Sequence, residues 1–112
     1  MKNGILGITK IVTCLLVISC YSAMAAEPEM PGKKVFNKWC IHCHAAGNDY
    51  PGTWKLSLRL GKEKSVLAER KDLNSEYIKY IVRNGFGGMP LFRRIEISDD
   101  ELNALTNYLV KQ

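Results

Sequence analysis

The sequence predicts an all-α domain of about four helices. Three stretches, residues 32–39, 74–84 and 98–110, repeat apolar side chains at the three- and four-residue spacing of an amphipathic helix. Two of them also carry start signals at their first residue, Asn74 and Ser98. The chain has 112 residues, which is enough for one small domain.

Residues 1–25 are predicted to be a secretory signal peptide. Lys2 and Lys10 form a positively charged end that precedes an apolar stretch over residues 11–18. Ala23-Met24-Ala25 supplies a small-x-small cleavage site. The apolar stretch is far shorter than the ~20 residues that a membrane-spanning helix needs. An alternative is that the lipobox-like run ending at Cys20 directs lipid attachment to that cysteine, which would anchor the protein to a membrane.

The charge balance of the chain is weakly basic. The sequence contains 16 Lys and Arg against 11 Asp and Glu, and two of the lysines lie in the predicted signal peptide. The basic residues form no long block, so nucleic acid is not an expected partner. The remaining bias allows a basic docking patch without establishing one.

The mature chain is expected to begin with a flexible arm at residues 26–31, which contains two prolines, followed by one domain at 32–112. From Gly32 the pattern becomes helical, with Val35, Phe36 and Trp39 on one side. We expect Phe36 and Trp39 to be core residues. Gly32 would permit a close crossing with another helix.

This first helix leads into a Cys-x-x-Cys-His run at residues 40–44. Such a run is the attachment signature of a c-type haem, in which two thiols add to the porphyrin vinyl groups and the imidazole ligates iron. A thioredoxin-like dithiol would need a βαβ pattern, and a zinc site would need a second Cys or His pair. The other cysteines, Cys14 and Cys20, lie in the predicted signal peptide. We therefore predict one haem, attached through Cys40 and Cys43 and ligated by His44, as a major part of a small core.

The sequence has only two histidines, and one of them, His42, lies between the two attachment points and cannot reach the opposite side of the ring, so bis-histidine ligation within one chain is excluded. His42 lies between the attachment points and is interpreted as a solvent-facing spacer. Residues 45–54 are predicted to be a loop, and a carbonyl near Pro51 is the candidate acceptor for the second N–H of His44. Trp54 is expected either to pack on the macrocycle or to donate to a haem propionate.

The next segment gives weaker signals. Leucines alternate with polar residues over 56–60, and since the rest of the chain is helical this stretch is predicted to be an irregular wall around the haem edge. Residues 63–70 are expected to form a short helix. A clearer helix follows at 74–84, with Asn74 as N-cap and Gly85 as stop signal.

Residues 85–90, Gly-Phe-Gly-Gly-Met-Pro, supply a candidate sixth ligand. The glycines allow the backbone to approach the ring closely, and Pro90 stiffens the chain after the methionine. The other methionines lie in the signal peptide or, as Met30, in the arm. We predict that Met89 ligates the iron; a packing role or an open iron site are the alternatives.

The final helix begins with a capping box at residues 98–101. Its most economical partner is the first helix, so Leu105 and Tyr108 are expected to meet Gly32 and Phe36.

Taken together, the order of these elements resembles a class I cytochrome c over about residues 32–110. The runs at 50–53, 82–86 and 89–93 are more narrowly similar to the small cytochrome subunits of flavocytochromes such as p-cresol methylhydroxylase and eugenol hydroxylase. The resemblance implies a small cytochrome c fold and a flavoprotein partner that oxidises phenolic or alcohol substrates. The stretch 56–73 is longer than we expect for the cresol enzyme. An alternative is therefore that the chain belongs to a sister group of cytochrome subunits that serves another dehydrogenase.

The expected function is periplasmic electron transfer by one low-spin haem c with His44 and Met89 as axial ligands, without catalysis on a substrate. Electrons would come from a flavoprotein and pass to a downstream periplasmic acceptor. The alternatives are a free carrier serving a terminal oxidase or reductase, and a haem sensor or enzyme with an open iron site. Arg93 and Arg94 are expected to pair with propionates, to form part of a docking face, or to be solvated charge.

Overall fold

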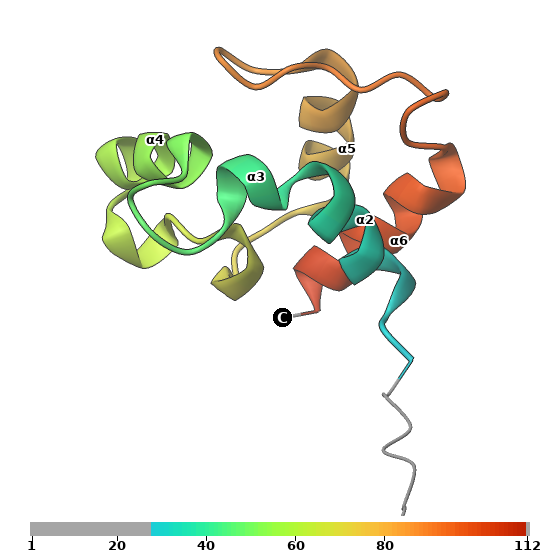
Figure 1. The fold of residues 1–112 in the computed structure, drawn as a ribbon, viewed down its shortest axis with the longest axis horizontal. Helices are drawn as coiled ribbons and strands as arrows, with labels where there is room; N and C mark the ends of the chain where they lie inside the picture. Colours follow the sequence, from blue (N-terminus) through green and yellow to red (C-terminus); the bar gives the residue numbers. More distant parts are fainter. Residues whose placement is uncertain (1–27, 112) are drawn as a thin grey trace, which may run out of the picture.

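The computed structural model describes residues 28–111. The predicted signal peptide, the lipid attachment at Cys20 and most of the predicted arm lie outside this range. The described part is helical, with no extended strand, which confirms the predicted all-α class (Figure 1). Its elements are α2 (Pro31–Trp39), α3 (Ile41–His44), α4 (Pro51–Leu60), the 3₁₀ turns η2 (Lys62–Lys64) and η3 (Leu67–Glu69), α5 (Ser75–Asn84) and α6 (Asp99–Val110). None of these helices is both long and apolar enough to cross a membrane.

The core forms where α2 crosses α6, the most extensive contact between two helices in the described chain. A Cβ atom at Gly32 would overlap the carbonyl oxygen of Ala104 and lie 2.6 Å from Cβ of Tyr108, so the two helices approach at a distance that only glycine allows. The rings of Phe36 and Tyr108 meet with their centroids 5.9 Å apart. The predicted partnership of the first and last helices is confirmed.

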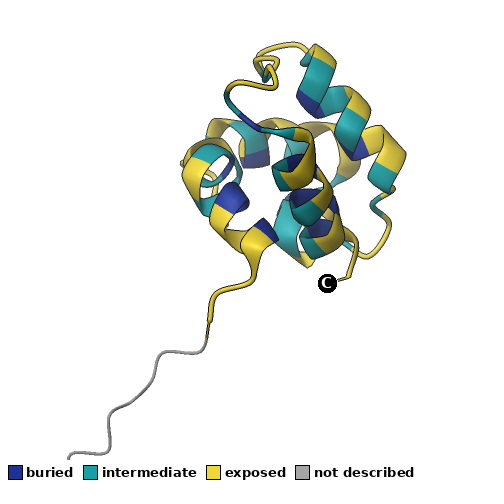
Figure 2. Ribbon diagram, turned by 90° about the vertical axis from the view of Figure 1, so that its right-hand side faces the viewer, coloured by how far each residue is buried: buried dark blue, intermediate teal, exposed yellow. Residues whose placement is uncertain are grey.

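Buried residues lie on the parts of these helices that face the interior (Figure 2). Ile97 and Leu105 are almost completely buried. The buried hydrophobic cluster consists of Val35, Phe36, Cys40, Ile78, Val82, Ile97, Leu102, Leu105 and Leu109.

The predictions of a loop over residues 45–54 and of an irregular wall over 56–60 are wrong from Pro51 on, because residues 51–60 form α4. Pro51 occupies the first turn, where its fixed φ suits a helix and its missing N–H has no intrahelical partner to lose. Leu56 and Leu60 are four residues apart and share a face, whereas Leu58 points to the other side and is 63 % exposed. The alternation therefore reflects leucines on two sides of one helix.

The predicted helix at 63–70 is also wrong, since the structure has two separate 3₁₀ turns there. The hydroxyl of Ser65 donates to the Lys62 carbonyl at 2.7 Å and so takes an acceptor that a continuing helix would use. Val66 then has an extended backbone, with ψ of 107°, which separates the turns.

Helices α5 and α6 follow their sequence signals. The side chain of Asn74 accepts a hydrogen bond from the N–H of Tyr77, and α5 ends at Gly85, whose φ is +73°. At α6, the Ser98 hydroxyl accepts from the Glu101 N–H at 3.2 Å and the Glu101 carboxylate accepts from the Ser98 N–H at 2.8 Å. Between them, the segment drawn in orange passes over α5 (Figure 1).

Candidate functional site

The Cys-x-x-Cys-His run lies at the junction of α2 and α3. The His44 N–H donates to the Cys40 carbonyl at 2.9 Å, so these residues form a single helical turn. Positions three and four apart share one helical face, which places Cys40, Cys43 and His44 together. Cys40 is buried and Cys43 is exposed.

The surroundings of Cys40 do not suit a reactive dithiol. Burial, with a smaller contribution from the neighbouring Cys43, raises the pKa of the Cys40 thiol to about 12. Dithiol oxidoreductases need the opposite shift, because the thiolate is the nucleophile. Among residues 28–111, no three His, Cys, Asp or Glu side chains gather around a common point that could hold a metal ion.

The His44 ring is held against the start of α4. A Cβ atom at Gly52 would lie 2.6 Å from Cε1 and 2.8 Å from Nδ1 of His44, so the backbone of Gly52 lies directly against the imidazole. Burial lowers the pKa of His44, which favours the neutral imidazole. Gly52 was not singled out from the sequence; its position just after Pro51 at a helix start is the signal that was available.

The predicted hydrogen bond from His44 to a carbonyl near Pro51 is absent. Nδ1 of His44 is buried and has no hydrogen-bond partner. Pro51 begins α4, and a carbonyl in the first turn of a helix accepts from an N–H four residues on.

Thr53 ties α4 to the end of the Cys-x-x-Cys-His run. It is only 2 % exposed, and its hydroxyl donates to the carbonyl of Ala45 at 2.7 Å. Sequence reasoning missed this residue, because a threonine inside a helix has no local pattern that marks such a contact.

Other residues near the run have the following positions. His42 is exposed, as predicted for a spacer. Trp39 packs edge-on against Phe92 with ring centroids 5.7 Å apart, and its buried Nε1 has no hydrogen-bond partner. Trp54 is 45 % exposed.

Met89 closes a tight turn. Phe86 and Met89 exchange two backbone hydrogen bonds, of 3.1 and 3.0 Å, across Gly87 and Gly88. Gly87 has φ of +58° and Gly88 has no positive φ, as in a type II′ turn. A Cβ atom at Gly85 would lie 2.7 Å from the Met89 carbonyl oxygen, so the turn folds back closely onto the end of α5. The predicted close approach of these glycines to the ring stays a prediction.

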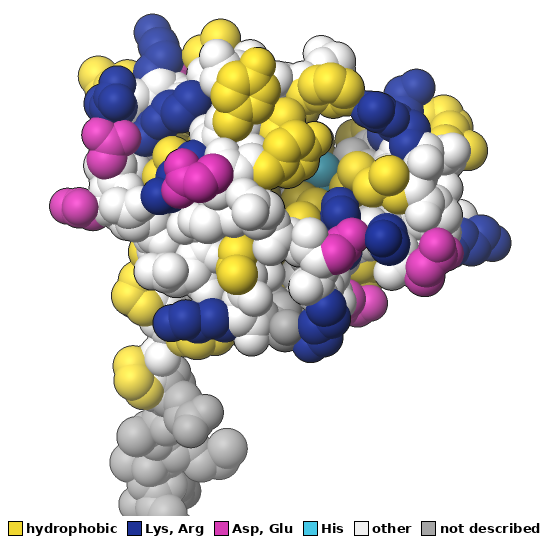
Figure 3. Space-filling view, turned by 180° about the vertical axis from the view of Figure 1, so that it is seen from behind, with side chains coloured by type: hydrophobic (Ala, Val, Ile, Leu, Met, Phe, Trp, Pro, Cys, Tyr) yellow, Lys and Arg dark blue, Asp and Glu magenta, His cyan; other side chains and the backbone are white. Residues whose placement is uncertain are grey.

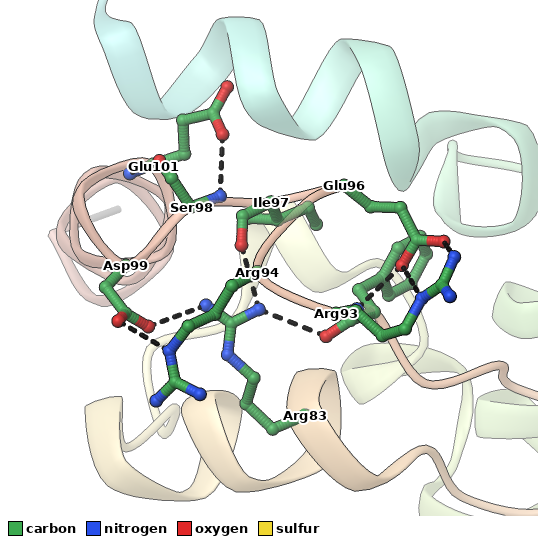
Figure 4. Close-up of polar contacts among 9 residues, drawn as sticks. Arg83, Arg93, Arg94, Glu96, Ile97, Ser98, Asp99 and Glu101 are labelled. Atoms are coloured by element: carbon green, nitrogen blue, oxygen red, sulfur yellow. Dashed lines mark hydrogen bonds and ion pairs between the residues drawn. The ribbon is translucent and has the colours of Figure 1, made fainter.

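The segment after Met89 is fastened to α5 by Arg83 (Figure 4). One guanidinium nitrogen donates to the carbonyls of Phe92, at 3.0 Å, and Ile97, at 2.8 Å. The other pairs with Asp99 at 2.8 Å. The sequence pattern did not single out Arg83.

Arg93 and Arg94 pair with carboxylates of their own segment. Arg93 bonds Glu96 and Arg94 bonds Asp99, both at 2.8 Å, on largely exposed side chains (Figure 4). Hydrogen bonds from Arg94 and then Arg83 lower the pKa of Asp99. Of the three roles predicted for these arginines, the contacts favour solvated surface charge, with each guanidinium paired to a nearby carboxylate.

The residues present fit a covalently attached haem. Within residues 28–111, ten large hydrophobic side chains are exposed, so much apolar surface faces solvent in the protein chain alone. The exposed residues include Trp54 and Leu58 on α4, Phe86 in the Met89 turn and Leu91 after it. Figure 3 shows a hollow rimmed by hydrophobic side chains with a histidine at its floor. The Cys40 and Cys43 thiols, the neutral imidazole of His44 and the Met89 thioether are the donor types that a c-type haem takes.

Comparisons with known proteins agree with this chemistry. A family model described as cytochrome C oxidase, cbb3-type, subunit III matches residues 27–109. The chain is 32 % identical over 94 residues to the 4-cresol dehydrogenase (hydroxylating) cytochrome c subunit of Pseudomonas putida, covering 84 % of this chain and 71 % of that protein. It is 36 % identical over 87 residues to cytochrome c6 of Cladophora glomerata, covering 78 % of this chain and 91 % of that protein. No solved structure gave a significant match.

Proposed function

Because the chain belongs to the class I c-type cytochromes, which transfer electrons on covalently bound haem c, we propose that Cys40 and Cys43 attach the haem and that His44 and Met89 are its axial ligands. The observation that carries this assignment is the shared face of Cys40, Cys43 and His44 on one helical turn. The Met89 turn supplies the thioether from a segment distant in sequence.

Haem c, when bound, supplies a one-electron iron couple. His44 and Met89 would occupy both axial positions in either oxidation state, so the coordination changes little and no substrate reaches the metal. Gly52 and Thr53 would hold the imidazole of His44 in place. The apolar side chains of α4 and of the Met89 turn would exclude water from the haem. A thioether ligand in an apolar shell gives a higher potential than a second histidine would.

The proposed electron donor is a flavoprotein dehydrogenase that oxidises phenolic or alcohol substrates. The support is the similarity to a 4-cresol dehydrogenase cytochrome c subunit over most of both chains. The proposed location is the bacterial periplasm, on the sequence of residues 1–25, with a lipid anchor at Cys20 as the alternative. A downstream periplasmic acceptor would reoxidise the protein.

A free carrier that diffuses between larger partners is the second candidate. It is favoured by the similarity to cytochrome c6 from several organisms, including Cladophora glomerata and, at 34 % identity, Euglena gracilis. A carrier of this kind would purify alone, whereas a dehydrogenase subunit would purify with its flavoprotein.

The partner is tested by affinity purification of the tagged mature protein from its native periplasm. A stoichiometric flavoprotein, identified by flavin absorbance and mass spectrometry, would support the dehydrogenase subunit and give its substrate class. A bare monomer would contradict it and favour the free carrier. An untagged strain carried through the same purification controls for proteins that bind the resin.

The ligand assignment is tested on the oxidised spectrum. Replacement of Met89 by Ala should abolish the sulfur-to-iron band at the red end and open the reduced iron to carbon monoxide. Met30→Ala is the matched control, since Met30 lies 55 % exposed before α2. A band that survives Met89→Ala, or high-spin iron in the unmodified protein, would contradict Met89 as ligand.

A further inference from the structure

Arg83 of α5 is the one side chain in the described chain that hydrogen-bonds both the segment after Met89 and the start of α6. Its guanidinium bonds the carbonyls of Phe92 and Ile97 and the carboxylate of Asp99, and the side chain is only 20 % exposed. We propose that Arg83 is a positioning residue that holds the Met89 segment closed and so sets how readily Met89 leaves the haem iron. This inference rests on the proposed ligation by Met89.

The geometry explains why one arginine controls this segment. The Met89 turn is closed on itself by the two Phe86–Met89 hydrogen bonds, which do not reach the rest of the fold. The first backbone bond to a helix comes three residues later, where the Phe92 N–H donates to the Val82 carbonyl at 2.8 Å. Arg83 bonds the carbonyl of that same Phe92, so both polar groups of its peptide backbone are held by consecutive residues of α5.

The second backbone carbonyl that Arg83 bonds, that of Ile97, fastens a later part of the same segment to α5. Ile97 has no exposed surface, and its carbonyl lies five residues beyond that of Phe92. A guanidinium presents several N–H groups in a rigid plane, so one side chain spans both carbonyls and a carboxylate. An ammonium group presents its donors from a single atom and fits this set less well.

The two arginines that follow supply matched controls. The side chain of Arg93 is 70 % exposed and hydrogen-bonds Glu96 within the same turn. The side chain of Arg94 is 77 % exposed and bonds Asp99. Neither contact joins the Met89 segment to α5, although both residues carry the charge that Arg83 carries.

The test measures the fraction of molecules in which Met89 has left the iron. Imidazole is added to the oxidised holoprotein, and loss of the sulfur-to-iron band reports displacement of Met89. Because imidazole binds only the open form, its apparent dissociation constant is inversely proportional to the open fraction. We expect Arg83→Met to lower that constant at least tenfold, equivalent to about 1.4 kcal/mol. Arg83→Lys should give an intermediate value.

Arg93→Met should leave the imidazole constant within about twofold of the unmodified protein. An unchanged constant in Arg83→Met, or an equal shift in Arg93→Met, would overturn the proposal. If Arg83→Met fails to fold, Arg83→Lys and Asp99→Asn carry the test, and both must tighten imidazole binding. An unmodified protein without the sulfur-to-iron band would instead refute the ligation by Met89, so the two failures are distinguishable.

Discussion

Gly52→Ala should move the imidazole of His44 from its position against α4. The added Cβ would lie 2.6 Å from Cε1 and 2.8 Å from Nδ1 of His44, and 2.7 Å from the carbonyl oxygen of Cys43. Ordinary contact begins at 3.4 Å, so the ring or the first turn of α4 must retreat by about 0.8 Å. His44 follows Cys43 directly, and a thioether bond there would restrict the retreat.

The expected loss of stability follows from this overlap. Overpacking of a tight site costs about 1–3 kcal/mol, and we expect about 2 kcal/mol here because one of the three atoms is backbone. For a domain of this size that corresponds to a fall of roughly 8–16 °C in Tm. The axial histidine would also shift, so the midpoint potential should change with the stability.

Thermal unfolding by circular dichroism and the midpoint potential by spectroelectrochemistry check both effects on the holoprotein. Lys33→Ala is the control, since Lys33 is an exposed residue of α2 outside the candidate site. Its Tm should correspond to less than about 0.5 kcal/mol of change. Equal Tm and potential in the two variants would show that the close approach at Gly52 does not position His44.

Three other variants test the contacts around the site. Gly32→Ala should lose about 3 kcal/mol in urea unfolding, because its Cβ overlaps the Ala104 carbonyl where the helices cross; a loss below that of Gly52→Ala would contradict this. Thr53→Val should lose about 1–2 kcal/mol by the same assay, since it leaves the Ala45 carbonyl without its donor, and Thr53→Ser should retain most of it. Hydrogen bonds from Arg94 and Arg83 hold the pKa of Asp99 in the folded protein below its ordinary value of 3.8, so this pairing stabilises the fold above that value. The Tm advantage over Asp99→Asn should therefore shrink as the pH falls below about 4 toward the lowered pKa; an advantage independent of pH would disprove the ion pairs.

The elements that could be predicted from sequence are those whose signals are local. The N-cap of Asn74 and the stop at Gly85 define α5, and the capping box at Ser98 defines the start of α6. The crossing at Gly32 was predictable because a helix with one small residue on an apolar face has an obvious place for close approach. Each of these inferences needed only a few neighbouring residues.

The elements that failed depend on tertiary context. Leu58 and Leu60 on α4 are 63 % and 41 % exposed in the protein chain alone, so their pattern is not that of a helix with one buried face. A helix that packs against an apolar cofactor as well as the protein core carries apolar residues on more than one side. Its sequence then lacks the three- and four-residue repeat by which an amphipathic helix is recognised. The turns around Ser65 depend on a side-chain hydrogen bond that no periodicity reports.

For the candidate site, sequence supplied the candidate ligands, whose roles stay predictions, and missed the residues that contact or fasten them. Cys40, Cys43 and His44 are recognisable because their chemistry fixes their spacing. Gly52 and Arg83 act through contacts with residues 8 to 16 positions away, and their identity alone does not announce a partner. The contacts of such residues can be identified only from the three-dimensional structure.

The crossing of α2 and α6 also determines when the fold can form during synthesis. Residues near opposite ends of the described domain must meet before the core closes, so a nascent chain that lacks α6 leaves the inner face of α2 in water. Cys40 belongs to the same buried cluster as Leu105 and Leu109 of α6. Its thiol is therefore accessible in the unfinished chain and becomes sequestered when the last helix docks. The proposed attachment of haem at Cys40 would thus be favoured in the open polypeptide, before folding has ended.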